Sequence, residues 1–211
     1  MNLGNDEKMG FVDEEKRSLI RKAIHCILIA KVGPRWEKDE NFRDTPNRFF
    51  SFLEEAWTSD EKKKEELGTC SPIVFPTKNK KMIISPYIRV FSLCPHHLLP
   101  VEYDITIAYM PKEIKGKISV LGASKLTRIA QILGRDAIMQ EDLIDRIVET
   151  IHQMISIEGI AILTTGTHMC MRCRGIKSNS PYIVPYMEGC FRDNDKVREE
   201  FYQAIQHKKE R

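Results

Sequence analysis

The sequence predicts an α+β protein with an antiparallel sheet, and three observations support this fold class. Apolar residues recur at helical spacing in two early segments and again in two segments after residue 123. Between these helical pairs, short runs rich in β-branched and aromatic residues are separated by prolines and by a Lys-Asn-Lys run. The order is therefore two helices, several strands, two helices and further strands, which is typical of α+β proteins.

Two helices are predicted in the first quarter of the chain, after a loose arm at residues 1–11. Between Val12 and Gly33 the apolar residues fall at helical spacing, with three acidic residues in the first turn. Asp44-Thr45-Pro46 predicts the start of the second helix, because a capping oxygen stands beside a proline at the first helical position. The charged run Ser59–Leu67 is interpreted as a solvated segment without chemistry.

Strands are predicted from residue 73 to about residue 109. The runs Ile73–Phe75, Met82–Ile84 and Ile88–Phe91 carry β-branched and aromatic residues, and Pro86 is expected to separate the second run from the third. From Asp104 to Tyr109 apolar residues alternate with polar or small ones, which is the period of a half-buried strand.

Two further helices and another strand follow. Ala123-Ser124 is expected to open a helix with one apolar face. The next helix is expected to run from about Gln140 to Glu158-Gly159, where glycine would supply a left-handed cap. Ile160–Thr165 is predicted to be a buried strand that leads into a cysteine-rich segment.

The composition is that of an ordinary soluble globular protein. Apolar residues make up 42% and charged residues 30% of the 211 positions. A net charge of +3 is too small to predict a nucleic-acid partner. The N-terminus lacks an apolar signal segment and no run approaches transmembrane length, so we expect a cytoplasmic protein without membrane association. The six irregularly spaced cysteines are then expected to be thiols, available for metal binding, rather than a disulfide framework.

Two cysteine-rich segments predict a zinc site. Cys94-x-x-His97 and Cys170-x-x-Cys173 each have a spacing that lets one loop supply two ligands. If the preceding strand continues through residue 170, Cys170 and Cys173 lie on opposite faces. The ligands are then Cys94, His97 and Cys170, with a fourth position open for water, as in catalytic sites. If residues 170–173 turn instead, Cys173 joins them and closes a structural site.

Two more histidines, His96 and His168, accompany these cysteines. In the open site they are spare imidazoles beside the metal, suited to general acid and base roles at neutral pH.

The segment Gly122-Ala-Ser124-Lys125-Leu-Thr-Arg128 is a candidate anion site. It places a hydroxyl and two cations over the first turn of a helix, where free backbone N–H groups and the helix dipole attract anions. An ordinary capped helix with solvated basic residues is the alternative. Lys125 is unfavourable against the dipole unless an anion binds there.

Three other polar positions have two interpretations each. If the strand continues, Arg172 and Arg174 share a face, so that Arg174 becomes a further phosphate contact. Gln140 and Glu141 head a helix, where Glu141 either complements the dipole or accepts hydrogen bonds from a flat, amide-like heterocycle. Arg48, in the first turn of the second helix, is by itself an exposed arginine.

Taken together, these segments resemble the GTP cyclohydrolase I family over roughly residues 10–205. The motifs that carry the resemblance stand in the family's order: Asp44-Thr-Pro-x-Arg48, Cys94-x-His96-His97-x-x-Pro100, Ile107-Ala-Tyr-Met-Pro111, Gly122-x-Ser-Lys-Leu-x-Arg-Ile129, Gln140-Glu-x-Leu143 and His168-x-Cys-Met-x-x-Arg-Gly175.

The resemblance implies a T-fold, an antiparallel sheet with two long helices, preceded by an N-terminal helical pair. Residues 69–211 would be the catalytic T-fold domain and residues 1–68 the arm and helices. It also implies a homodecamer with active sites at subunit interfaces. The substrate would be GTP: water attacks C8 of guanine, formate leaves, and 7,8-dihydroneopterin triphosphate forms for folate, pterin or deazapurine supply.

The resemblance also implies the site residues. Zn²⁺ would be held by Cys94, His97 and Cys170, with His96 and His168 moving protons. Gln140 and Glu141 would hold guanine, and Ser124, Lys125, Arg128 and Arg174 the ribose and triphosphate. Arg48 would reach in from a neighbouring subunit.

Three features depart from the family pattern. Pro95 stands where the family usually has Glu, and the glycine expected near Glu102-Tyr103-Asp104 is missing. Ser180-Pro-Tyr-Ile-Val-Pro185 replaces a Ser/Thr-rich strand with one expected to be broken by its prolines. Two rival functions therefore stay open: a diverged cyclohydrolase for another purine nucleotide, and a non-catalytic, zinc-stabilised nucleotide-binding module.

Overall fold

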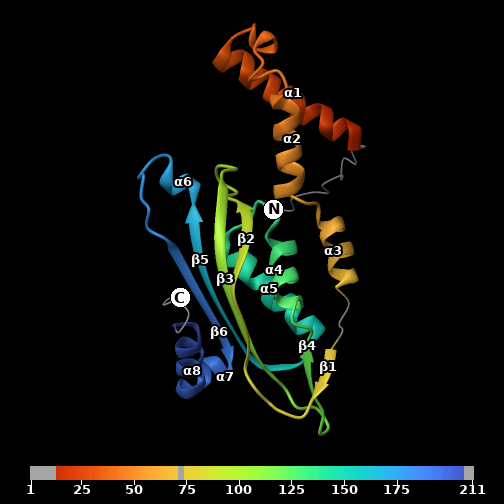
Figure 1. Ribbon diagram of the computed structural model, residues 1–211, viewed down its shortest axis with the longest axis vertical. Helices are drawn as coiled ribbons and strands as arrows, with labels where there is room; N and C mark the ends of the chain where they lie inside the picture. The colour runs from red at the N-terminus through yellow and green to blue at the C-terminus, as the bar shows by residue number, and fades with distance from the viewer. Residues whose placement is uncertain (1–12, 71–73, 207–211) are drawn as a thin grey trace, which may run out of the picture. The chain divides into compact units, whose positions relative to one another are not determined.

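The computed structural model describes residues 13–70 and 74–206 (Figure 1). The predicted arm, Val12 and the strand start at residue 73 lie outside these ranges. Within them, no helix combines the length and the hydropathy that a bilayer crossing requires. The chain divides into two compact units, residues 1–55 and 56–211. This division by contacts does not test whether each part folds alone. The predicted domain boundary between residues 68 and 69 therefore stays a prediction.

The first unit is helical, and the predicted N-terminal helical pair is confirmed. Gly33 ends the first helix in the left-handed region, with φ of +101°, and its N–H bonds back to carbonyls of the last turn. A small core packs Ile24, Leu28 and Trp36 together. The elements are α1 (Asp13–Val32), the 3₁₀ turn η1 (Trp36–Lys38) and α2 (Thr45–Ala56).

The second unit is organised around a four-stranded antiparallel sheet in the order β2-β3-β5-β6. Its strands are β2 (Ile83–Leu93), β3 (Pro100–Pro111), β5 (Ile157–His168) and β6 (Tyr182–Gly189). A separate two-stranded sheet pairs β1 (Val74–Thr77) with β4 (Ile118–Leu121). Figure 1 shows β4 near the open end of the long β2–β3 hairpin, opposite the loop that joins the two strands.

The two faces of the large sheet are covered differently. Helices α4 (Lys125–Gly134) and α5 (Gln140–Met154) pack on one face, against the odd-numbered residues of β3 from Val101 to Tyr109, which are fully buried. Helices α7 (Cys190–Asp193) and α8 (Asp195–Gln206) cover part of the other face (Figure 1). The predicted α+β class and T-fold arrangement are therefore confirmed.

The run Ser59–Leu67, predicted to be a solvated segment, forms most of helix α3 (Asp60–Thr69) and contains a buried charge. Lys63 is only 3% exposed. Its Nζ lies 2.5 Å from Oδ2 of Asp136, which also accepts a hydrogen bond from Arg146 at 2.8 Å. The prediction was wrong for Lys63, because the acidic partner that anchors α3 lies in the α4–α5 connection, 73 residues away.

Three predicted strand breaks at prolines are wrong. The first is at Pro76, which lies inside β1 and pairs with Ser119 of β4. Strand β2 runs through Pro86, because its register with β3 shifts between Ser85 and Ile88 and this bulge accommodates the proline. Pro185 lies inside β6, which is an edge strand and therefore tolerates a residue without an N–H.

The predicted helix cap at Gly159 is also wrong. Helix α5 ends at Met154, and Gly159 lies in β5. A Cβ at this position would stand 2.5 Å from the carbonyl oxygen of Glu188. Glycine is needed here for the close approach of β6 rather than for a turn.

Candidate metal centre and active site

The antiparallel pairing of β3 with β5 brings the two cysteine segments to one end of the sheet. Val101 at the start of β3 pairs with His168 at the end of β5. The β2–β3 loop, which holds Cys94, therefore neighbours α6 (Met169–Arg172), which holds Cys170. The ligand atoms of Cys94, His97 and Cys170 all lie within 4.8 Å of one another.

The β2–β3 loop is a tight turn that presents the two histidines. The N–H of Cys94 donates to the carbonyl of Leu99 at 2.9 Å, which closes the loop. The carbonyl of Cys94 accepts from the N–H groups of His97 and Leu98. Pro95 occupies the second position of this turn, where its fixed φ is favourable. Proline at this position therefore stiffens the turn without disrupting it.

The predicted continuation of the strand through Cys170 is wrong, because β5 ends at His168 and the chain turns into α6. A turn here was the condition under which Cys173 was expected to close the site. Cys173 is nevertheless exposed, and in the part of the chain that the structure describes the group of potential ligands contains Cys94, His97 and Cys170 without it.

The turn also separates the two arginines that were expected to share a strand face. Nε of Arg172 donates to Oδ1 of Asn179 at 3.0 Å. Arg174 instead turns to His97, where Nη1 of the guanidinium contacts Nε2 of the ring. Arg174 thus lies at the metal end of the sheet, although the strand argument that predicted its position does not hold.

The donor set suits a thiophilic divalent cation such as zinc. Burial, followed by the neighbouring Cys94, raises the pKa of the Cys170 thiol. A cation held by Cys94 and Cys170 would remove this penalty, because ligation stabilises the thiolate. The hydroxyl of Tyr103 is buried close by without a hydrogen-bond partner among the described residues, and burial raises its pKa. Two sulfurs and one imidazole at this spacing are ligands that zinc prefers.

A pocket of about 170 Å³ adjoins the metal group. Tyr182 forms one wall, and its hydroxyl donates to Oε1 of Glu141 at 2.8 Å. The remaining apolar lining comes from Pro95, Ile138, Met139 and Met171, and the polar lining from His96, Gln140, Glu141 and His168. Apolar walls with one carboxylate and two imidazoles suit a flat ring that carries N–H donors on its edge.

His168 is held between two tyrosines. Its ring lies edge-on to those of Tyr103 and Tyr182, with both centroid distances 5.8 Å. Burial lowers the pKa of His168, and the Glu141 carboxylate opposes this shift. A neutral imidazole beside the metal group is able to accept a proton. His96 also adjoins the metal group, with Nδ1 3.8 Å from Sγ of Cys94.

The candidate anion site on α4 has the expected local features. Ser124 is the N-cap, yet its side chain makes no capping hydrogen bond, and the first turn of α4 contains no acidic residue. Lys125 is only 8% exposed, and its ammonium forms no ion pair within the described part of the chain. Arg128 is exposed one turn further along. A largely buried lysine at a helix N-terminus, whose ammonium has no ion-pair partner among the described residues, is suited to an anionic ligand.

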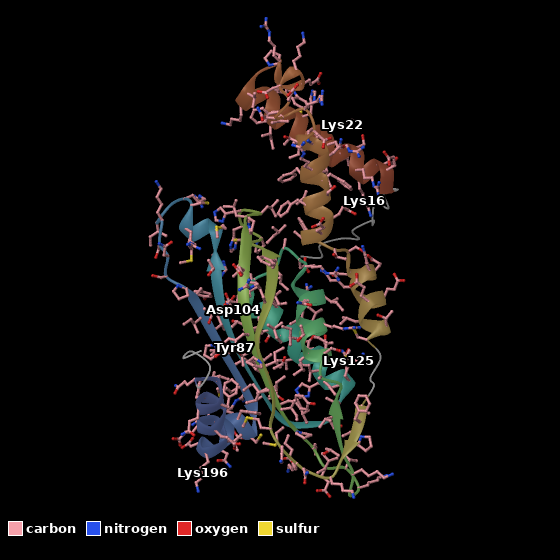
Figure 2. All side chains as sticks on the ribbon, viewed as in Figure 1. Lys16, Lys22, Tyr87, Asp104, Lys125 and Lys196 are labelled. Atoms are coloured by element: carbon pink, nitrogen blue, oxygen red, sulfur yellow. The ribbon has the colours of Figure 1, made fainter. Side chains whose placement is uncertain are left out.

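This anion site lies far from the metal group within one chain. The N-terminal end of α4 follows β4, where the N–H of Leu121 donates to the hydroxyl of Tyr109. Figure 2 shows Lys125 at this end of the helix. The other end of α4, Gly134, packs against Val90 of β2, near the metal loop. A ten-residue helix adds about 14 Å between these ends. The structure therefore does not bring Ser124, Lys125 and Arg128 into the pocket.

The remaining predicted residue, Arg48, belongs to the first unit. Its Nε lies 3.4 Å from Oδ2 of Asp44, one helical turn earlier. This exposed pair leaves the guanidinium accessible.

Sequence reasoning missed three residues around the pocket: Tyr103, Tyr182 and Thr164. Both tyrosines lie in segments that depart from the family pattern, and this departure was the available signal. Thr164 gave no signal, because its partners come from α5 and β6.

Comparisons with known proteins agree with the motifs. The family described as GTP cyclohydrolase I matches residues 20–206. A protein named GTP cyclohydrolase 1 1 from Pseudomonas putida is 33% identical over 190 residues, covering 90% of this chain and 96% of that protein. GTP cyclohydrolase 1 of a Synechococcus strain is 32% identical over 203 residues, covering 96% and 84%. A crystal structure of the archaeosine synthase QueF-Like matches 56% of this chain and 96% of its own, with 13% identity and a TM-score of 0.39.

Proposed function

Because the chain belongs to the GTP cyclohydrolase I family, we propose that it hydrolyses the guanine ring of GTP. In this reaction water adds at C8, formate is released, and the product is 7,8-dihydroneopterin triphosphate. The observation that carries the proposal is the grouping of Cys94, His97 and Cys170 beside a pocket that contains Glu141 and His168.

Each residue at the metal end has a role in this reaction. Cys94, His97 and Cys170 would hold Zn²⁺, which when bound would lower the pKa of water to about 7 and so supply a nucleophile at neutral pH. The Glu141 carboxylate accepts hydrogen bonds from the N–H edge of guanine. His168 accepts a proton from the attacking water and returns it to the opening ring. The more exposed His96 transfers protons on the side from which formate leaves.

The triphosphate requires groups from another chain. A pocket of about 170 Å³ is smaller than the ~300–1,000 Å³ typical of ligand sites, and it accommodates the base only. Ser124, Lys125 and Arg128 bind the phosphates at the far end of α4, so a neighbouring subunit must bring this turn to the pocket. Arg174 contacts His97 of the metal group in the same chain, and Arg48 reaches in from a neighbour.

A ring of subunits meets this requirement, because each interface then joins the metal end of one chain to the α4 turn of the next. We propose the homodecamer typical of the family, with residues 69–211 as the catalytic domain and residues 1–68 as the arm and helices. The enzyme acts in the cytoplasm, in folate, pterin or deazapurine supply.

The test is to incubate the zinc-loaded protein with GTP and to measure formate and a fluorescent pterin. Equal amounts of both are expected. Formate without pterin would identify a diverged cyclohydrolase, and tight GTP binding without either product would identify a binding module. Removing zinc with a chelator should abolish turnover, and adding zinc back should restore it.

A further inference from the structure

The side chain of Gln140 lies behind His168 and is almost completely enclosed. It is 2% exposed, and its neighbour Thr164 is fully buried. Nε2 of Gln140 lies 2.5 Å from Oγ1 of Thr164 and 3.3 Å from the carbonyl oxygen of Tyr182. On its other side, Oε1 lies 3.1 Å from Nε2 of His168.

The surroundings fix the orientation of the Gln140 amide. The carbonyl oxygens of Tyr182 and Thr164 lie 3.3 and 3.4 Å from its nitrogen. Both are acceptors only, so turning the amide by 180° would place its oxygen against two other oxygens. The amide nitrogen therefore faces the strands, and the amide oxygen faces His168.

The hydroxyl of Thr164 determines which groups donate and which accept in this arrangement. It donates its hydrogen to the carbonyl of Val184 on β6 at 3.2 Å, so its oxygen is free to accept from Gln140. Gln140 in turn presents an oxygen that cannot donate. Nε2 of His168 must therefore carry a hydrogen.

We propose that this chain of hydrogen bonds, from Val184 through Thr164 and Gln140, fixes His168 as the Nε2–H tautomer and leaves Nδ1 as its only proton-exchanging atom. Among the described residues, Nδ1 has no hydrogen-bond partner, while the His168 ring lines the pocket. Thr164 and Gln140 are then positioning residues. The Gln140 side chain has no N–H left for guanine, and only its main chain remains for the base.

Gly166 supports the same interpretation. A Cβ at this position would lie 2.4 Å from Oε1 of Gln140 and 2.9 Å from Nε2 of His168. Glycine leaves the space in which this hydrogen bond forms. Its backbone is not in the left-handed region, so only the missing side chain matters.

The inference deepens the proposed function and rests on it, and a substitution at Thr164 tests it away from the substrate. Thr164→Val keeps the shape but removes the acceptor that holds the Gln140 amide. We expect kcat for GTP to fall by about tenfold or more, with KM changed by less than about threefold. Thr164→Ser should retain kcat, because it keeps the hydroxyl. Thr165→Val, on the opposite face of the same strand, is the matched control and should leave kcat unchanged.

A spectroscopic measurement tests the tautomer directly. In the zinc-loaded protein labelled with ¹⁵N in its histidine rings, we expect the hydrogen of His168 on Nε2 in the wild type and in Thr164→Ser. A hydrogen on Nδ1 in the wild type would overturn the inference, as would a Thr164→Val kcat equal to that of Thr165→Val. Should Thr164→Val not fold, Gly166→Ala replaces it with the same expectation. If the wild type released no formate from GTP, the proposed function would fail, while the ring spectrum would still decide the tautomer.

Discussion

A mixing experiment would show whether one active site is built from two chains. Lys125→Ala changes only the candidate anion site at the N-terminal turn of α4, and His168→Ala changes only the metal end of the sheet. These two ends lie about a helix length apart in one chain. Each active site should therefore combine the metal end of one subunit with the N-terminal turn of α4 from its neighbour. Each variant alone should be nearly inactive, whereas oligomers that contain both should recover activity.

The size of the recovery follows from how subunits are distributed around the interfaces. With equal amounts of the two chains assembled at random, about one quarter of the interfaces pair an intact metal end with an intact α4 turn. Residual activity from Lys125→Ala alone should be low at moderate GTP concentrations. Losing one charge-assisted phosphate contact costs about 1.5–3 kcal/mol, which raises KM by about 10- to 150-fold.

The assay is formate release by oligomers co-expressed with two different tags and purified through both. The matched control mixes Lys125→Ala with Arg128→Ala. These changes affect the same half, so every interface receives one damaged α4 turn and no recovery is expected. Recovery in the control, or none in the Lys125→Ala and His168→Ala mixture, would refute the assignment of the two halves to different chains.

Three further predictions follow from single contacts. Cys173→Ala should bind zinc with unchanged stoichiometry, as measured by metal analysis, because Cys173 is exposed and lies outside the group of potential ligands. Loss of zinc would instead support the closed site, in which Cys173 is the fourth ligand. Tyr182→Phe removes the hydrogen bond to Oε1 of Glu141 and should weaken the discrimination between GTP and ITP, which lacks the 2-amino group. Tyr186→Phe, which breaks a similar bond to Glu188, is the control and should not change this discrimination. Equal selectivity ratios in both variants would contradict a role for Tyr182. Lys63→Met should lower the free energy of unfolding by about 1–3 kcal/mol, because among the described residues Asp136 then keeps Arg146 as its one cationic partner. Lys62→Met, at the exposed neighbouring position, is the control. Equal thermal midpoints for the two variants would show that the buried pair contributes nothing.

The sequence was sufficient for features that depend on local pattern. Helical periodicity predicted α1, α2, α4 and α5, and the Cys-x-x-His spacing predicted that Cys94 and His97 share one loop. It was insufficient where a distant partner decides the outcome. Nothing in a run of lysines and glutamates distinguishes Lys63, whose burial depends on Asp136. The bulge that carries β2 past Pro86 likewise depends on the register of β3.

At the candidate site, the group of potential ligands contains the same three residues as the predicted set, which stays a prediction, but the geometric argument for it was wrong. The strand was expected to continue and to turn Cys173 away. The chain turns at Met169 instead, and Cys173 stays outside the group because the turn leaves it exposed. Periodicity cannot locate the end of a strand when the following residues suit either state, since Met, Cys and Arg are not turn formers.

The departures from the family pattern cluster around the pocket beside the metal group, while the potential metal ligands are intact. Pro95 stiffens the loop between Cys94 and the histidines, and Tyr182 places its ring and hydroxyl against His168 and Glu141. Tyr103 packs behind His168. The three differ from Cys94, His97 and Cys170, which form the group of potential metal ligands. Changes at these positions should therefore alter KM, base selectivity and proton transfer, and leave zinc affinity largely unaffected. Substrate preference, more than metal chemistry, is where this chain is expected to differ from its relatives.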